Sequence, residues 1–281
     1  MADQWNPQTY EAFSDLRARP FWDLASLIDT TVAAPDAGAI RTMVDLGCGT
    51  GTLTAQLAQR LGVQRCVGVD SSAAMLERAA EHTDEIVEFR SGDISEWPGG
   101  PDDPGDSTEP VEPVDLVFSN AALQWLPDHA AVLARWIGGV RPGGQIAVQV
   151  PANADHPSHT CMVDVAYREP YLSAMQGEPP PDPVAANVST PADYAELLHD
   201  LGGVDPHVRL QVYPQVMAST SAVVEWVSGT SLRRFFRVLP DELHQPFVDE
   251  YRDHLGATVG DRAPYFYAFK RILMWTATAT S

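Results

Sequence analysis

Val44-Asp45-Leu46-Gly47-Cys48-Gly49-Thr50-Gly51 joins a short apolar run, Thr42–Leu46, to a segment with apolar residues at helical spacing, Leu53–Leu61. A run of this length before a glycine loop is typical of a buried parallel strand, and the glycines allow the backbone to turn sharply and approach a ligand closely. A dinucleotide fingerprint, GxGxxG, would require glycine at Thr52, and the GK[ST] of a phosphate-binding loop is absent. The stretch predicts a ligand-binding strand–loop–helix unit, although taken alone it also fits a simple tight turn.

Further apolar runs alternate with helical segments along the chain. We expect strands at Gln64–Asp70, Ile86–Arg90, Val114–Ser119 and Gln145–Val150, and helices at Ser72–Glu81 and Ala130–Ile137. The last of these strands follows an expected turn at Arg141–Gly144. Strands that alternate with helices predict an α/β fold with a parallel, doubly wound sheet.

Carboxylates stand at the ends of three successive expected strands, at Asp45, Asp70 and Asp93. Because the carboxyl ends of parallel strands meet at one edge of a sheet, we expect the three acids to line one crevice. Asp45 suits a cationic group such as the amino group of an amino-acid cofactor. Asp70 stands where an acid accepts hydrogen bonds from ribose hydroxyls, and Asp93 could accept from an adenine amino group. The alternatives are an N-cap role for Asp70, for which Ser72 is the better candidate, and an Asx turn at Asp93.

The remaining segments predict short helices and a closing pair of strands. Pro20 divides a helical segment at residues 7–29 into two expected helices, and residues 152–190 look irregular. Later helices are expected at Pro191–Leu201, Ala222–Trp226 and Asp241–His254, and an antiparallel hairpin with inserted helices is expected from strands at Val208–Val216 and Tyr265–Thr276. Pro98–Pro113, rich in proline, glycine and acid, predicts a mobile surface loop, with a functional acidic segment as the alternative.

The charge, the hydrophobic pattern and the cysteines of the chain indicate which classes of partner and ligand to expect. The formal net charge is −20 and Lys270 is the only lysine, so nucleic acid and anionic membranes are disfavoured, and an anionic ligand would need arginines placed locally against the global field. No apolar run approaches the roughly 20 residues that span a bilayer, and the start of the chain lacks a signal-peptide pattern, so we expect a cytoplasmic protein. Cys48, Cys66 and Cys161 form no CxxC pair, which argues against structural disulfides and a zinc knuckle, and we expect no metal.

Several segments resemble a known family. VDLGCGTG, VGVDSSAAML and SGDI are similar to the successive motifs of class I S-adenosylmethionine methyltransferases. The opening WNPQTYEAFSDLRARP, residues 119–129 (SNAALQWLPDH), and the segments AVQVPANADHPSHT, REPY, WVSGTSLR and YAFKRIL more closely resemble the trans-aconitate methyltransferases. The resemblance runs through nearly the whole chain. Pro98–Pro113 looks inserted, and Tyr265–Arg271 departs from the Phe-Pro-Phe-Arg-Arg that the family usually shows.

The resemblance implies a Rossmann-like fold, with a doubly wound, mostly parallel seven-stranded sheet and a helical cap, in a single domain over residues 1–281. Cap helices would occupy residues 1–30, the cofactor-binding core residues 40–150, and the rest of the sheet with substrate-cap insertions residues 151–281. The implied cofactor is S-adenosyl-L-methionine. The residues expected to bind it are Asp45, Gly47, Cys48, Gly49, Gly51, Asp70, Ser71, Met75, Gly92, Asp93, Ile94, Asn120 and Trp125.

The implied reaction moves a methyl group to a carboxylate of trans-aconitate or a related small polycarboxylate and gives a monomethyl ester. A carboxylate is ionised at pH 7, so no general base is expected. His129 and Trp125 are candidates for orienting the acceptor, with a polar role at a helix start and core packing as their alternatives. Arginine binds carboxylates with a two-pronged fork. The expected substrate residues are Arg233 as the favoured anchor, Tyr171, Arg17, Arg19 and Gln124, with Arg168 and Arg234 as further candidate arginines.

Two other functions fit the sequence. The first is an S-adenosylmethionine-dependent methyltransferase that acts on another small molecule, through a hydroxyl or carbon nucleophile. The second is a catalytically silent binding module that has kept the cofactor fold, against which the intact glycine loop and the three acids argue. The sequence does not predict the oligomeric state.

Overall fold

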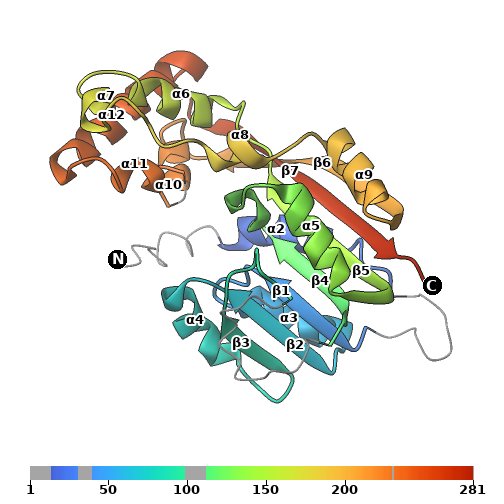
Figure 1. Ribbon diagram of the computed structural model, residues 1–281. Coiled ribbons are helices and arrows are strands. Elements are labelled where there is room, and N and C mark those ends of the chain that lie inside the picture. The colour runs from blue at the N-terminus through green and yellow to red at the C-terminus, as the bar shows by residue number, and fades with distance from the viewer. Residues whose placement is uncertain (1–13, 31–39, 99–111, 230, 281) are drawn as a thin grey trace.

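The computed structural model of the chain is built around one seven-stranded sheet (Figure 1). The structure describes residues 14–30, 40–98, 112–229 and 231–280, with the side chains of residues 14–17 left out. The strand order is β3-β2-β1-β4-β5-β7-β6. The strands are β1 (Thr42–Leu46), β2 (Arg65–Asp70), β3 (Val87–Ser91), β4 (Val114–Asn120), β5 (Val140–Pro151), β6 (Gly203–Met217) and β7 (Tyr265–Thr278).

The first five strands are parallel, and β7 runs antiparallel to both β5 and β6. The central strand β1 is buried from Met43 to Leu46, which explains why its sequence is a continuous apolar run broken only by Asp45. The chain order reverses between β1 and β4, because β2 and β3 lie on one side of β1 and β4 on the other. That reversal places the ends of β1 and β4 at the switch point where open α/β sheets bind ligands.

Helices cover both faces of the sheet. They are α2 (Ser14–Ala25), α3 (Thr52–Leu61), α4 (Ala73–Ala79), η1 (Ala80–His82), α5 (His129–Gly138) and α9 (Pro191–Asp200). Phe21 of α2 and Leu57 of α3 belong to one buried cluster. Trp136 of α5 and Tyr194 of α9 belong to another. The two clusters contain successive residues of β1, Met43 in the first and Val44 in the second, so the clusters lie on opposite faces of the sheet.

A separate group of helices forms a cap with its own hydrophobic core. Figure 1 shows these helices gathered around one end of β6 and β7. They are α6 (Pro157–Ala166), α7 (Tyr171–Ala174), α8 (Pro183–Asn187), α10 (Ala222–Ser228), α11 (Arg233–Phe236) and α12 (Asp241–Val259). Tyr213 of β6 and Tyr267 of β7 pack into this core with Phe247 and Tyr251 of α12. The two longest strands therefore carry the cap, since their far ends extend into its core.

The expected Rossmann-like, mostly parallel seven-stranded fold is confirmed, as is the hairpin of β6 and β7 with helices inserted between them. Other expectations are wrong. Residues 152–190 contain three helices, α6, α7 and α8, and Pro20 lies inside the continuous helix α2. Arg141–Gly144 is a register irregularity within β5 and not a turn before it. The start of the opening segment and residues 99–111 of the expected loop lie outside the described residues.

In the described parts of the chain, no helix combines the length and the apolar character needed to cross a bilayer.

Candidate active site

The glycine loop between β1 and α3 leaves open space beside one glycine only. Gly47, Gly49 and Gly51 all have positive φ, at 84°, 57° and 75°. A Cβ atom at Gly47 would collide with Ala122, and one at Gly51 would collide with Phe89, whereas one at Gly49 would meet nothing within 4 Å. Gly47 and Gly51 are therefore required for packing, and Gly49 is the position where the backbone faces free space that a ligand can occupy.

Asp45 is a buried acid at the end of β1, 2% exposed. Thr54 of α3 donates a hydrogen bond of 2.5 Å from Oγ1 to its Oδ2. Burial raises the pKa of Asp45 to about 7, with the Thr54 hydrogen bond acting in the opposite direction and the nearby Asp70 adding to the rise. Burial disfavours the charged form, so a cation placed near this carboxylate would be stabilised by it and would favour its ionisation.

Asp70, at the end of β2, holds the glycine loop directly. Its Oδ2 accepts a hydrogen bond of 2.9 Å from the amide of Gly49, and its Oδ1 accepts one of 2.9 Å from the amide of Ser72. Ser72 caps α4 by accepting from the amide of Met75 at 3.3 Å, which confirms Ser72 as the helix cap. Each Asp70 oxygen has a second lone pair, so the carboxylate can accept ribose hydroxyls while it positions the loop.

The end of β3 supports the Asx-turn interpretation of Asp93. Its Oδ1 accepts hydrogen bonds from the amide and the hydroxyl of Ser95, at 2.8 and 2.7 Å. The neighbouring Ile94 carbonyl accepts from Nε1 of Trp136 at 2.8 Å. An adenine-binding role for Gly92, Asp93 and Ile94 stays a prediction. So do the roles expected for exposed Ser71, for buried Met75 and for Cys48, whose thiol pKa is raised by burial.

Three carboxamide side chains near the carboxyl ends of β4 and β5 carry buried atoms that have no hydrogen-bond partner in the described part of the chain. These atoms are Asn120 Oδ1, Gln124 Oε1 and Gln149 Nε2. Asn120 and Gln149 are register partners on β4 and β5, so their side chains lie side by side. Gln124, in the short helix η2 (Leu123–Trp125), uses its Nε2 to bond the carbonyl of Ala121 at 2.7 Å. Buried polar atoms are almost always paired, so these three mark a place where a ligand can complete the hydrogen bonding.

The two residues expected to orient the acceptor differ in their settings. Both ring nitrogens of buried His129 are engaged, Nδ1 with the hydroxyl of Tyr194 at 2.6 Å and Nε2 with the carbonyl of Leu123 at 2.9 Å. Burial lowers the pKa of His129, so the ring is neutral and joins α5 to α9 and η2. Trp125 is 56% exposed, which leaves its indole free to cover a ligand. The geometry gives His129 a structural position, and the orienting roles expected for His129 and Trp125 stay predictions.

The candidate arginines are separated by their burial. Arg234 of α11 is only 11% exposed, and its Nη1 lies 2.8 Å from Oδ2 of Asp182. Its Nε and Nη2 are buried and have no hydrogen-bond partner among the described residues. Arg233, the favoured anchor, is half-buried at the start of α11. Of the remaining candidates, Arg168 pairs with Glu250 at 2.9 Å, Arg19 is exposed, and the side chain of Arg17 is not described.

Asp182 is a functional candidate that the sequence analysis missed. Its Oδ2 also lies 3.2 Å from Nδ1 of His159, and its Oδ1 caps α8 by accepting from the amide of Val184 at 2.9 Å. Burial disfavours its charge, but the hydrogen bond from His159 and the charge of Arg234 together hold the pKa of Asp182 well below its usual range. Asp182-Pro183, a capping residue before proline, was the available sign of a helix start. Tyr171, by contrast, is buried in the cap core against Phe247.

The similarity to known proteins extends over both the core and the cap. Residues 43–144 match the family model described as a methyltransferase domain. The chain is 42% identical over 277 residues to the trans-aconitate 2-methyltransferase of Deinococcus radiodurans, with 96% of each chain covered. It is 37% identical over 273 residues to that of Mycobacterium tuberculosis, covering 96% of this chain and 95% of the relative. The YcgJ protein of Bacillus subtilis shares the fold, with a TM-score of 0.56 at 17% identity over 93% of this chain and 100% of that one. The chain therefore belongs to the trans-aconitate 2-methyltransferase family.

Proposed function

We propose that this protein transfers a methyl group from S-adenosyl-L-methionine to a carboxylate of trans-aconitate and so forms a monomethyl ester. The observation that carries the proposal is the length of the similarity to the Deinococcus radiodurans trans-aconitate 2-methyltransferase, which extends over 96% of both chains. A similarity of this extent includes the cap as well as the cofactor core. Because function depends on the site and not on the shared sheet, a similarity that includes the cap supports the same substrate as well as the same fold.

The residues at the switch point fit the cofactor. Gly49 faces free space, Asp70 holds the loop and keeps lone pairs for ribose hydroxyls, and buried Asp45 favours a nearby cation such as the amino group of a methionine moiety. When bound, S-adenosylmethionine supplies a methyl group on a positively charged sulfur, which a carboxylate oxygen can accept by in-line displacement without any proton transfer. The chain therefore needs no general base, in agreement with a His129 ring that is fully engaged in structural hydrogen bonds.

The work left to the protein is to position the acceptor and to exclude water. Arg234 suits the first task. A guanidinium has five donors in a planar fork, and Asp182 holds the Nη1 end at 2.8 Å while Nε and Nη2 on the adjacent edge have no partner among the described residues. A carboxylate bound along that edge would accept two parallel charge-assisted hydrogen bonds. Arg234, and not its neighbour Arg233, is therefore the proposed substrate anchor.

The anchor is connected to the cofactor edge of the sheet by one short helix. Asp182 caps the start of α8, and Asn187 at its end donates from Nδ2 to the carbonyl of Gln124 at 3.0 Å. Five helical residues at about 1.5 Å each separate these two contacts by about 8 Å. Gln124 follows the end of β4, where Asn120 and Gln149 carry amide atoms with no hydrogen-bond partner among the described residues. A small acid with several carboxylates offers one carboxylate to the guanidinium and another to these amides.

The net negative charge of the chain makes a local positive charge necessary for binding a polycarboxylate. With a net charge of −20, the overall field repels a polycarboxylate. A guanidinium in a largely desolvated position provides a local attraction that solvent and salt screen only weakly. Asp182 partly offsets this charge, and in return it fixes the orientation of the fork.

Methyl transfer from labelled S-adenosylmethionine to a panel of acceptors tests the proposal. The panel contains trans-aconitate, other di- and tricarboxylic acids, neutral phenols and amines. We expect trans-aconitate to give the highest kcat/KM and the neutral acceptors to give none. Turnover of a phenol without turnover of any polycarboxylate would establish the alternative, a methyltransferase of another small molecule. Tight cofactor binding with no acceptor methylated would establish a silent binding module.

A further inference from the structure

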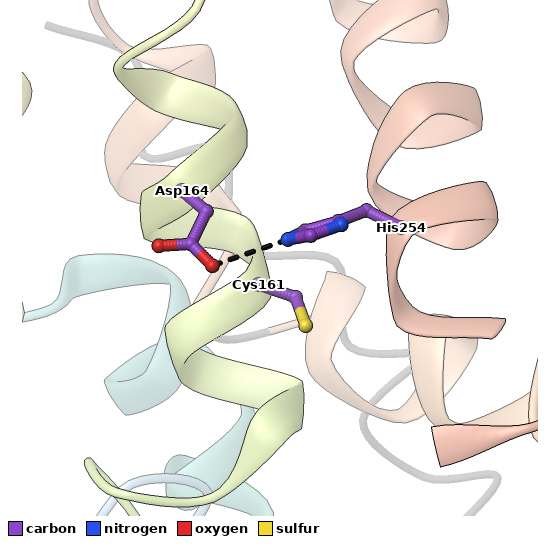
Figure 2. A group of neighbouring side chains, drawn as sticks. All are labelled: Cys161, Asp164 and His254. Carbon is purple, nitrogen blue, oxygen red and sulfur yellow. Dashed lines mark hydrogen bonds and ion pairs between the residues drawn. The ribbon is translucent and has the colours of Figure 1, made fainter. Parts of the chain in front are cut away.

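The cap contains a cluster of potential metal ligands that shares no residue with the candidate active site. Cys161 and Asp164 lie one helical turn apart on α6, and His254 faces them from α12 (Figure 2). One ligand atom from each residue lies within 4.8 Å of the other two. Nε2 of His254 is 3.1 Å from Oδ2 of Asp164. The three side chains converge although they come from segments some ninety residues apart. No short sequence motif therefore predicts this cluster.

We propose that Cys161, Asp164 and His254 form a binding site for a divalent transition metal of the zinc class. A thiolate, an imidazole and a carboxylate are the three ligand types that Zn²⁺ accepts, and a thiolate disfavours Mg²⁺ and Ca²⁺. Metal–ligand bonds of about 2.0–2.3 Å in tetrahedral geometry place ligand atoms about 3.3–3.8 Å apart. The observed separations, up to 4.8 Å, require shifts of about 1 Å, which side-chain rotation can supply.

The surroundings of the cluster favour an incomplete coordination sphere. Asp164 is exposed and His254 is half-buried, so water can reach the centre and supply a fourth ligand. Cys161 is buried, and its thiol makes a weak contact of 3.5 Å with the hydroxyl of Thr258. A metal binds the thiolate and not the thiol, so it must displace the thiol proton of Cys161. This arrangement predicts a moderate affinity, below that of a four-ligand structural zinc site.

Metal binding at this cluster would tie α6 to α12. These helices already pack together, and the hydroxyl of Tyr251 on α12 donates to the carbonyl of Ser158 on α6 at 2.8 Å. The next residue on α6 is His159, whose ring contacts Asp182 beside Arg234. The metal site thus lies on the same helix as a side chain that supports the proposed anchor, but it shares no residue with it. The proposal stands independently of the methyl acceptor.

Cobalt titration of the full-length chain tests the site. The protein is stripped with a chelator, held under a phosphine reductant and titrated with Co²⁺, whose thiolate complexes show a charge-transfer band in the near ultraviolet. We expect a one-to-one titration in the parent. The band should be absent in Cys161→Ser, and His254→Asn should weaken the affinity by at least about tenfold, the smaller loss seen even for outer-shell partners. Zn²⁺ should displace the cobalt and raise the Tm of the parent.

His207→Asn is the matched control, because His207 is an exposed histidine 3.5 Å from Asp205 with no cysteine beside it. This variant should titrate like the parent. Absence of a thiolate band in the parent, or its retention in Cys161→Ser, would overturn the proposal. Should Cys161→Ser fail to fold by circular dichroism, His254→Asn decides the question, because its residue is only half-buried and unchanged cobalt affinity in it would also overturn the site.

Discussion

Replacing Arg234 with lysine separates the charge of the proposed anchor from its fork. Lysine can keep the ion pair with buried Asp182, but it has no second edge of donors to offer a carboxylate. A hydrogen bond to a charged group contributes about 1.5–3 kcal/mol. Because each 1.36 kcal/mol is a factor of ten in rate, loss of one such bond should lower kcat/KM for trans-aconitate about 10- to 150-fold.

Alanine at this position would be less informative. Asp182 is only 7% exposed, and removing its partner would leave an uncompensated buried charge, a loss of about 3–5 kcal/mol in stability. The assay is therefore the initial rate of methyl transfer by Arg234→Lys over a range of trans-aconitate concentrations, with Arg233→Lys as the control. Calorimetric affinity for S-adenosylmethionine should be unchanged in both variants.

The refuting result is equally specific. If Arg234→Lys retains the parental kcat/KM, the unpartnered guanidinium edge has no role in substrate binding. If Arg233→Lys shows the loss instead, the anchor is the residue that the sequence favoured. A fall in cofactor affinity in Arg234→Lys would mean that the variant disturbs the core, and the unpartnered edge would then not explain the loss.

The remaining predictions concern the cofactor core and the acidic loop. Gly49→Ala should lose S-adenosylmethionine affinity in calorimetry. Gly62→Ala is the control, because Gly62 at the end of α3 has a similar positive φ and equally free space; this variant should lose as much stability as Gly49→Ala but keep the cofactor affinity. Equal affinities in the two variants would contradict the role of the loop. The folded-state pKa of Asp45 is about 7, against 3.8 for an unperturbed aspartate, so ionisation of Asp45 lowers the stability of the fold progressively from about pH 4 to pH 7. Asp45→Asn should therefore raise the Tm of the free protein more at pH 8 than at pH 4. Cofactor binding to the parent should release a proton below pH 7, measured by calorimetry in buffers of different ionisation enthalpy, and Asp45→Asn should abolish that release. Replacing Gly99–Glu112 with a short Gly/Ser link should leave turnover nearly unchanged, and a large loss would show that the loop contributes to the site.

The parallel core was predictable because its strands are buried on both faces. Continuous apolar runs such as TMVDL have one structural interpretation when a glycine loop and a helical pattern follow, so β1 begins and ends at the expected residues, Thr42 and Leu46. The acids at the strand ends followed from the same reasoning, since topology places them at one edge. The separate roles of these acids could not be predicted. Whether Asp93 accepts hydrogen bonds from its own turn or from a ligand depends on geometry that the spacing of residues does not determine.

The cap was harder to predict for a physical reason. Apart from α6 and α12, its helices have at most seven residues, and their stability comes from a shared core of aromatic residues and not from an amphipathic pattern along each helix. Three helices beyond residue 150 nevertheless begin with a capping residue followed by proline, at His156-Pro157, Asp182-Pro183 and Thr190-Pro191, and the sequence pattern predicts only the last of them. Pro20 predicts a break, but it lies only six residues into α2, near the start of the helix.

The choice between Arg233 and Arg234 could not be made from the sequence. Adjacent residues on a helix point about 100° apart, so which of two neighbouring arginines enters the cap depends on how α11 is docked. The structure buries Arg234 against an acid from the start of α8, a helix that the sequence analysis did not expect. The substrate anchor thus depends on a contact between two segments that each had to be placed first.

A carboxylate methyl ester is cleaved by alkali, whereas a methyl ether or a carbon-bound methyl group is not, so the chemistry of the product shows whether this chain makes an ester. The full-length protein is incubated with trans-aconitate and methyl-labelled S-adenosylmethionine, and the isolated product is treated with alkali. We expect a singly methylated tricarboxylate whose label is released quantitatively as methanol. A product that keeps its label through alkaline hydrolysis, as an ether or a carbon-methylated compound would, would show that the chain is not a carboxylate methyltransferase.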